Sequence, residues 1–238
     1  MVFVRGAMKT VKDYLFPVFC LSCGIEGFWM CDNCFSFIDI TTQLFCPLCH
    51  EKTSAGEVCL VCMKKQLTSF LTQHIASTMY EESGRIGKII HTLKYDFADD
   101  SMPVIEKIIQ TWVKKHRDHL PDVDVIIPVP LHKKRYAERG FNQAILLARV
   151  LAKEGEIPID ENILTRSRNT PHQARLDREG RLQNVKEAFH VFTLDSIQGK
   201  RVLLVDDVYT TGATMQTCAE ALLASGASSV YGWTLARG

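Results

Sequence analysis

The sequence lacks a strong charge of either sign and any long apolar run. Lys and Arg number 28 against 27 Asp and Glu, a formal net charge of +1, so the chain as a whole has no electrostatic signature of nucleic-acid or membrane binding. No apolar run approaches the roughly 20 residues that span a bilayer. Lys9, Lys12 and Asp13 interrupt the apolar stretch that an export signal needs. These absences predict a cytoplasmic protein without a membrane span, and Met8 is a candidate start.

Two nucleotide-binding fingerprints are also missing. The chain has no G-x-x-x-x-G-K-[ST] and no G-x-G-x-x-G, so a P-loop NTPase and a dinucleotide-binding fold lack their motifs. Internal repeats and low-complexity tracts are absent as well. A chain of 238 residues with 46% hydrophobic residues has room for one α/β core and a small accessory module.

Cysteine, by contrast, is abundant and concentrated. Eight of the nine cysteines form four C-x-x-C pairs within residues 20–62. Each pair supplies two ligands to a tetrahedral Zn²⁺ ion, so four pairs predict two structural Cys₄ sites. Sequential pairing closes the shorter loops, and cross-braced pairing or an iron–sulfur cluster is an alternative. The sequential sites are Cys20, Cys23, Cys31 and Cys34, then Cys46, Cys49, Cys59 and Cys62.

The rest of the cysteine-rich segment is short and irregular. Such a segment buries too little apolar surface to fold alone, so metal binding is expected to supply the folding energy. Its aromatic residues are expected to cap a minimal core, and stacking on nucleic-acid bases is the alternative; they are Phe28, Trp29, Phe35, Phe37 and Phe45. Cys218 stands apart, on the apolar face of a predicted helix, as a small buried hydrophobe.

From about residue 74 the pattern alternates between strands and helices, which predicts a mostly parallel sheet flanked by helices. The predicted strands are 74–80, 123–129, 188–192, 201–205 and 229–235. The predicted helices lie around 86–93, 104–112, 141–152 and 214–224, the second of them capped by Ser101. The expected organisation is a lead segment (1–16), a double zinc ribbon (17–66) and an α/β domain (67–238).

Residues 202–215, V-L-L-V-D-D-V-Y-T-T-G-A-T-M, are the most informative segment. An apolar strand leads to two carboxylates, then to a Thr/Gly loop that enters a helix. Ligands of open α/β sheets lie beyond the carboxyl ends of strands, and free amides at a helix start bind phosphate. Asp206 and Asp207 are expected to accept hydrogen bonds from sugar hydroxyls, with help from Mg²⁺. Taken singly, an N-cap cluster and a plain strand–helix turn are the alternatives.

This segment resembles the motif of type I phosphoribosyltransferases that binds 5-phosphoribosyl-1-pyrophosphate (PRPP). Further stretches, in the same order, are similar to the ComF competence-protein family, and the resemblance covers nearly the whole chain with the cysteine pairs included. They are Lys94-Tyr95, V-I-I-P-V-P at 125–130, R-G-F-N-Q-A at 139–144, Thr170 with Gln173, Arg181, Asn184-Val185 and Ala188-Phe189.

The resemblance implies a role for each part of the site. Asp206 and Asp207 would hold the ribose 2′ and 3′ hydroxyls. The 5′-phosphate would lie against Thr210, Thr211, Gly212, Ala213 and Thr214. The turn Val129, Pro130 and Leu131, helped by Lys133 and Arg135, would hold the pyrophosphate.

Two basic segments, both predicted as loops, fit this assignment. Residues 132–139 carry four Lys or Arg, and residues 166–181 carry five Arg, among them Arg175. Cations stabilise a departing pyrophosphate, and residues 165–181 fall where such enzymes have a mobile flap. Arg135 and Arg175 are therefore candidate catalytic residues, and a solvated surface is the alternative for each.

Two functions follow from these expectations. The chain would transfer ribosyl-5-phosphate from Mg-PRPP to a nitrogen acceptor, or it would be a non-catalytic adaptor that uses the PRPP site for sensing. The family resemblance implies a role in DNA uptake during natural transformation, with single-stranded DNA and a ComFA-type helicase as partners. The sequence leaves the acceptor, turnover and the oligomeric state open.

Overall fold

The computed structural model describes residues 17–95, 98–166, 189–192 and 196–238, with backbone alone for 98–100. Met8, Arg175 and residues 167–181 of the predicted flap lie outside the described residues. So do Thr170, Gln173, Arg181, Asn184-Val185 and Ala188, which contributed to the family resemblance.

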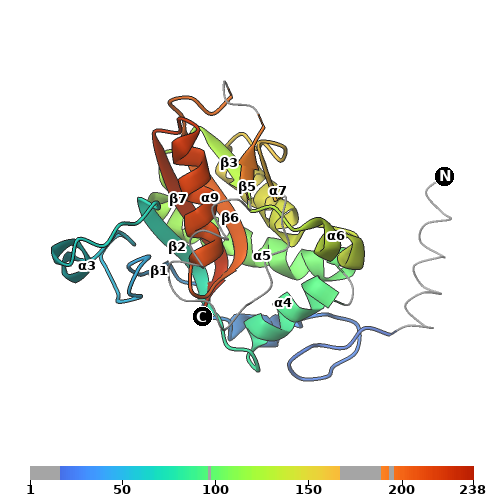
Figure 1. Ribbon diagram of the computed structural model, residues 1–238. Coiled ribbons are helices and arrows are strands. Elements are labelled where there is room, and N and C mark those ends of the chain that lie inside the picture. Colours follow the sequence, from blue (N-terminus) through green and yellow to red (C-terminus); the bar gives the residue numbers. More distant parts are fainter. Residues whose placement is uncertain (1–16, 96–97, 167–188, 193–195) are drawn as a thin grey trace, which may run out of the picture.

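A five-stranded sheet forms the centre of the molecule (Figure 1). Its order is β1 (Gln43–Leu44), β2 (Gln73–Met79), β7 (Ser229–Arg237), β6 (Arg201–Tyr209) and β3 (Val125–Pro128). The four strands from β2 to β3 are parallel, whereas β1 runs antiparallel to β2. The predicted α/β architecture with a mostly parallel sheet is confirmed.

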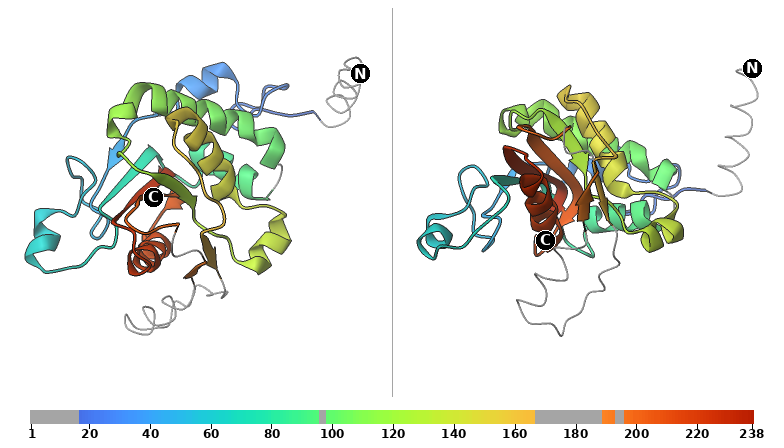
Figure 2. Two further views of the ribbon diagram at one scale, coloured as in Figure 1. Left: turned by 90° about the horizontal axis from the view of Figure 1, so that it is seen from above. Right: turned by 45° about the horizontal axis from the view of Figure 1, so that its top comes forward.

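Helices cover both faces of this sheet (Figure 2). One face carries α4 (Arg85–Tyr95), α5 (Ala98–His116) and α7 (Gln143–Gly155), and the other carries α9 (Ala213–Ala224). A 3₁₀ turn, η1 (Arg117–His119), follows α5. A separate antiparallel pair, β4 (Leu164–Arg166) and β5 (Phe189–Val191), packs beside α9. The strand predicted at 188–192 is therefore present, but outside the main sheet.

The core lies on both sides of β6 and β7. Val202 to Val205 are fully buried, as a central parallel strand with helices on both faces requires. On the α5 side, Trp112 packs edge-on against Trp233 with ring centroids 5.9 Å apart. On the α9 side, the predicted apolar face of the helix is buried; it comprises Met215, Cys218, Ala219 and Leu222.

Two local predictions were wrong. Residues 132–139, expected as a loop, contain the helix α6 (Lys133–Arg139), because the His132 ring accepts a hydrogen bond from Lys134 N–H and Gly140 ends the helix at a φ of 79°. Ser101 does not cap α5, which begins three residues earlier at Ala98 and carries Pro103 inside its first turns. Pro103 is the sixth residue of the helix, so its missing N–H costs α5 one i→i−4 hydrogen bond near its N-terminus.

The cysteine-rich segment contains α2 (Asp32–Ser36), β1 and α3 (Leu60–Lys64). β1 joins this segment to the main sheet through pairs between Gln43 and Ala76 and between Leu44 and Ile75. The boundary expected after residue 66 stays a prediction. Across the part of the chain that the structure describes, no helix combines the length and apolarity needed to cross a membrane.

The buried face of α5 is expected to carry much of the stability. Ile109 is fully buried, so Ile109→Ala should lower the free energy of unfolding by about 2–4 kcal/mol through lost burial and a cavity. Glu106→Ala on the exposed side of the same helix should change it by less than about 0.5 kcal/mol. Urea unfolding followed by circular dichroism measures both. Equal losses would contradict this assignment of the core face.

Candidate functional site

The acid pair lies inside β6 and not beyond its end, which corrects the predicted strand limit of Val205. The ladder with β7 continues to the pair Tyr209–Arg237, because β7 runs alongside to the same length. Successive side chains of a strand point to opposite faces. Asp207 is buried and forms an ion pair with Lys94 of α4. Asp206 lies toward α9, where its charge acts on Cys218.

The electrostatics of Asp206 set it apart from an ordinary surface carboxylate. Burial, followed by the negative charge of Asp207, raises the pKa of Asp206 well above that of an ordinary Asp. A hydrogen bond from Asp207 N–H to Asp206 Oδ1, 2.9 Å long, only partly offsets this. A raised pKa at a strand end is typical of functional carboxylates. Cations or hydroxyl donors arriving here would stabilise the charged form.

The loop after β6 presents backbone N–H groups at the start of α9. Gly212 is the N-cap with a φ of 74° and no side-chain cap, a conformation that favours glycine. The first N–H groups of a helix have no acceptor within it. Thr210, Thr211 and Ala213 are exposed, and Thr214 is half-buried. The loop is thus an accessible set of amide and hydroxyl donors with a positive dipole end.

The turn Val129–Leu131 lies next to the acid pair. Val129 N–H donates to the carbonyl oxygen of Val205, the residue before Asp206, over 2.9 Å. From the other side, Asn142 Nδ2 donates to the Val129 carbonyl over 3.0 Å. Asn142 is buried and also caps α7 by accepting from Ala144 N–H. The turn is therefore held between β6 and α7 through Val129, and its other two residues, Pro130 and Leu131, are half-buried.

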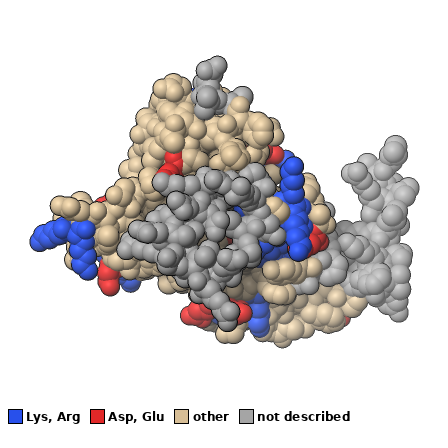
Figure 3. All heavy atoms as spheres, in the orientation of Figure 1, with Lys and Arg blue, Asp and Glu red and all other residues tan. Residues whose placement is uncertain are grey.

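Basic side chains gather near this edge of the sheet. Lys133 and Arg135 are exposed on α6, and Figure 3 shows Lys and Arg atoms over the α6 region at the right of the view. The charges of Arg135 and Asp206 both act on Arg166 at the end of β4, whose pKa is lowered by burial. The fold thus brings Arg135 and Arg166 to the side of the sheet where Asp206 lies.

Three residues of this region were given no role by the sequence alone. Lys94 stood in the family resemblance without a function, and its ion pair with Asp207 depends on how α4 packs. Arg166 was one of five arginines in a basic run without periodicity. Tyr209, inside the motif itself, is buried with its hydroxyl on the Pro47 carbonyl. Only the spatial neighbours of these residues distinguish them.

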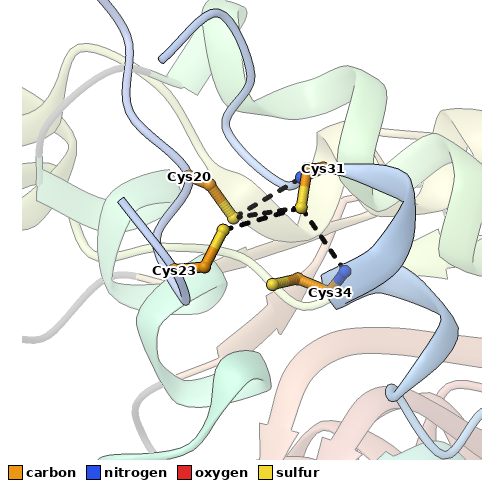
Figure 4. A group of neighbouring side chains, drawn as sticks. All are labelled: Cys20, Cys23, Cys31 and Cys34. Atoms are coloured by element: carbon orange, nitrogen blue, oxygen red, sulfur yellow. Dashed lines mark hydrogen bonds between the residues drawn. The ribbon is translucent and has the colours of Figure 1, made fainter. Parts of the chain in front are cut away.

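The eight clustered cysteines form two sets of four, in the sequential order. Within each set the sulfur atoms lie within 4.8 Å of one another. Figure 4 shows the first set, where Cys31 Sγ is 3.9 Å from Cys20 Sγ and 3.7 Å from Cys23 Sγ. In the second set, Cys49 Sγ is 3.4 Å from Cys59 Sγ. A tetrahedral Zn²⁺ with Zn–S bonds near 2.3 Å separates its sulfurs by about 3.8 Å, so both sets fit a zinc ion.

The chemistry of the donor atoms agrees with this geometry. Burial opposes ionisation of Cys20, but backbone N–H hydrogen bonds from Cys31, Cys23 and Ser22 outweigh it and lower its pKa to about 6. The pKa of Cys46 is lowered to about 6 in the same way. Burial and the neighbouring thiols raise the pKa of Cys23 and of Cys62 to about 12 and also raise that of Cys49, so in each cluster without metal one thiol ionises readily and another does not. None of the nine cysteines forms a disulfide. Thiolates are the form that binds metal.

The comparisons with known proteins agree with the fold and the motif. Residues 102–237 match the family model of the phosphoribosyl transferase domain. The chain is 31% identical to the DNA utilization protein YhgH of Shigella flexneri, over 93% of this chain and 97% of the relative. It is 30% identical to the competence protein ComFC of Bacillus subtilis, over 87% and 84%. It is 39% identical to competence protein F of Haemophilus influenzae, over 52% and 54%.

The parallel sheet, the acid pair and the phosphate-type loop define a phosphoribosyltransferase-like domain. With two Cys₄ clusters preceding that domain, the chain belongs to the ComF family.

The raised pKa of Asp206 leads to a prediction on stability. The ligand-free protein should lose stability as pH rises from about 4, the value in the unfolded chain, toward the higher folded pKa. Asp206→Asn removes the buried charge, so its Tm at pH 7 should exceed that of the wild type by roughly 2–4 °C. The gap should shrink toward pH 4 in a thermal-melt series.

Asp124→Asn is the matched control at the other end of β6. Its pair with Arg201 lowers the pKa of Asp124 to about 2. That contribution is present above the unfolded pKa and is lost as pH falls, so this variant should lower the Tm at pH 7. An Asp206→Asn protein that melts below the wild type at pH 7 would contradict the account of a destabilising charge.

Metal content tests the two clusters separately. Cys23 and Cys49 are the exposed second cysteines of their pairs. Wild-type protein should carry two zinc ions per chain by elemental analysis, and Cys23→Ser and Cys49→Ser should each carry about one. Iron in place of zinc, or a single metal in the wild type, would refute the assignment.

Proposed function

We propose that this chain is a PRPP-binding, phosphoribosyltransferase-like protein of the ComF family that acts in DNA uptake. The observation that supports it best is the shared edge of Asp206, Asp207, the loop 210–214 and the turn 129–131. To bind PRPP, a protein needs carboxylates for the ribose hydroxyls, backbone N–H groups for the 5′-phosphate and cations for the pyrophosphate. The names of the relatives, which refer to competence and DNA utilization, supply the cellular context.

Each group has a distinct role in this proposal. Asp206 and Asp207 accept hydrogen bonds from the ribose hydroxyls. The amides and hydroxyls of Thr210 to Thr214 bind the 5′-phosphate. The turn 129–131 binds the pyrophosphate, and Lys133 and Arg135 stabilise its charge. Mg²⁺, bound with PRPP, would neutralise part of the pyrophosphate charge. Burial of Asp206 suits this role, because its charge is stabilised only when a ligand arrives.

In the transfer reaction, the bond between ribose C1 and the pyrophosphate oxygen breaks and pyrophosphate leaves with the electron pair. A nitrogen lone pair of the acceptor forms the new bond to C1, and that nitrogen then loses its proton. The protein's contribution is positioning and stabilisation of the leaving group, with no covalent nucleophile. Arg175, outside the described residues, stays a candidate for the same task.

The second candidate function is a non-catalytic adaptor that binds single-stranded DNA and senses PRPP. Its support is the exposed surface of the second cysteine cluster. Around α3, Lys64 and Lys65 are exposed together with Leu60, Val61 and Met63, and Figure 3 shows basic atoms over this part of the molecule. Binding through such lysines should weaken steeply with salt. A ComFA-type helicase partner and a cytoplasmic location, where thiols stay reduced, complete the proposal.

Titration calorimetry with PRPP and Mg²⁺ tests the ligand site. Asp206→Asn combined with Asp207→Asn should weaken PRPP binding about 10-fold or more, since each charged hydrogen bond contributes about 1.5–3 kcal/mol. Asp122→Asn with Asp124→Asn makes the same charge change at the opposite end of β6 and should leave the affinity unchanged. Failure of the wild type to bind PRPP, or equal affinity of the first variant, would overturn the proposal.

Turnover separates the two candidates. Pyrophosphate release from PRPP with a panel of nitrogenous bases supports the transferase. PRPP binding without release, together with salt-dependent binding of single-stranded DNA, supports the adaptor.

A further inference from the structure

The second cysteine cluster contacts the end of β6 through one backbone carbonyl. Pro47 lies inside the pair Cys46–Cys49 and is buried. Its carbonyl oxygen accepts a hydrogen bond from Tyr209 Oη over 2.9 Å and a second one from Gln216 Nε2 over 3.5 Å. Tyr209 directly precedes the loop 210–214, and Gln216 lies in the first turns of α9. The contact therefore spans both ends of the proposed phosphate loop.

The Tyr209 phenol also packs directly against the backbone of the loop at Gly212. A Cβ atom at Gly212 would lie 2.1 Å from Tyr209 Oη, so the Gly212 backbone rests directly on that hydroxyl. Gly212 is the N-cap whose conformation directs the first amides of α9. A shift of the hydroxyl would shift this turn, because no side chain lies between them. Pro47 thus holds the Tyr209 hydroxyl in the position against which the Gly212 backbone packs.

The surroundings of Tyr209 hold the phenol in place. Tyr209 is 2% exposed, and the His74 ring stacks on it with centroids 3.8 Å apart. His74 is fixed in turn by Thr234 Oγ1 at 3.1 Å. The Arg237 guanidinium lies 4.3 Å from the Phe45 ring, next to Cys46. Hydrogen bonds in such a buried environment are stronger than exposed ones. The buried bond from Tyr209 to Pro47 therefore restricts movement of the loop relative to the second cluster.

The first cysteine cluster docks differently. Leu21 occupies in the pair Cys20–Cys23 the position that Pro47 occupies in Cys46–Cys49. Its carbonyl accepts from Lys88 Nζ of α4 over 3.1 Å, in an exposed contact. Asp32 pairs with Lys107 of α5, also at the surface. In Figure 2 the first cluster (blue) lies by α5 and the second (cyan) on another side of the sheet.

We propose that the second cysteine cluster, when it holds its metal, is a brace for the phosphate loop, with Tyr209 as the positioning residue between them. Metal loss from Cys46, Cys49, Cys59 and Cys62 would release Pro47 and lower affinity for the 5′-phosphate. By reciprocity, a ligand in the loop would strengthen metal retention at this cluster. The affinity part of this proposal rests on the proposed PRPP site, whereas the ordering of the loop does not.

Two matched pairs of variants test it in full-length protein prepared with zinc, and the two cysteine variants are each expected to lack one of the two metal ions. Tyr209→Phe and Lys88→Met each remove the donor to the equivalent carbonyl of a cysteine pair. Cys49→Ser and Cys23→Ser each remove the exposed thiol of one cluster. The readout is amide hydrogen exchange of peptides covering residues 210–216, with PRPP affinity measured alongside.

Tyr209→Phe and Cys49→Ser should each speed exchange in residues 210–216, and Tyr209→Phe should weaken PRPP binding about 5-fold, as the loss of one buried hydrogen bond predicts. Lys88→Met and Cys23→Ser should leave both measurements at wild-type values. Unchanged exchange in Tyr209→Phe and Cys49→Ser, or equal acceleration in all four variants, overturns the brace. Faster exchange in Tyr209→Phe and Cys49→Ser, together with a wild type that does not bind PRPP, would leave the brace intact and refute the ligand site.

Discussion

Two adjacent carboxylates within the largely buried central strand β6 impose the main constraint on this structure. Charge in such a place is costly unless partners surround it. Asp207 meets this requirement through Lys94, which obliges α4 to pack with its last turn against β6. Asp206 has no such ion pair among the described residues, and its raised pKa reflects that. The domain thus holds one carboxylate in an ion pair and leaves the other without one among the described residues.

The rest of the site follows from the same strand. β6 pairs with β3 on one side and β7 on the other, so the turn after β3 and the loop after β6 reach the same edge. Asn142 holds that turn from α7, and Tyr209 holds the loop from below. A rigid sheet therefore positions backbone donors that a loop alone would leave disordered. Donors that are held in place before binding lower the entropic cost of binding any ligand.

The cysteine clusters are integrated with the domain and do not form a detached appendage. β1 extends the main sheet, and Pro47 receives two hydrogen bonds from the β6–α9 connection. A metal that folds such a short segment also fixes everything the segment touches. Pro47 of the second cluster is thus in direct contact with the strand and the helix on either side of the loop 210–214.

Much of this was predictable from local patterns. The spacing of the cysteine pairs predicted two Cys₄ sites and favoured sequential pairing through its shorter loops, and the folded chain decided between that pairing and the cross-braced alternative. The parallel sheet and the loop at 210–214 follow from apolar periodicity and one glycine. Three features needed the tertiary structure: the helix α6, stabilised by a His132 cap that periodicity does not reveal; the extension of β6 through Asp206, set by β7; and the roles of Lys94 and Tyr209. The sequence by itself determined which chemical groups the protein carries, because composition and spacing are local. Only the folded chain decided which of them meet, because contacts such as Tyr209 with Pro47 join residues 162 positions apart.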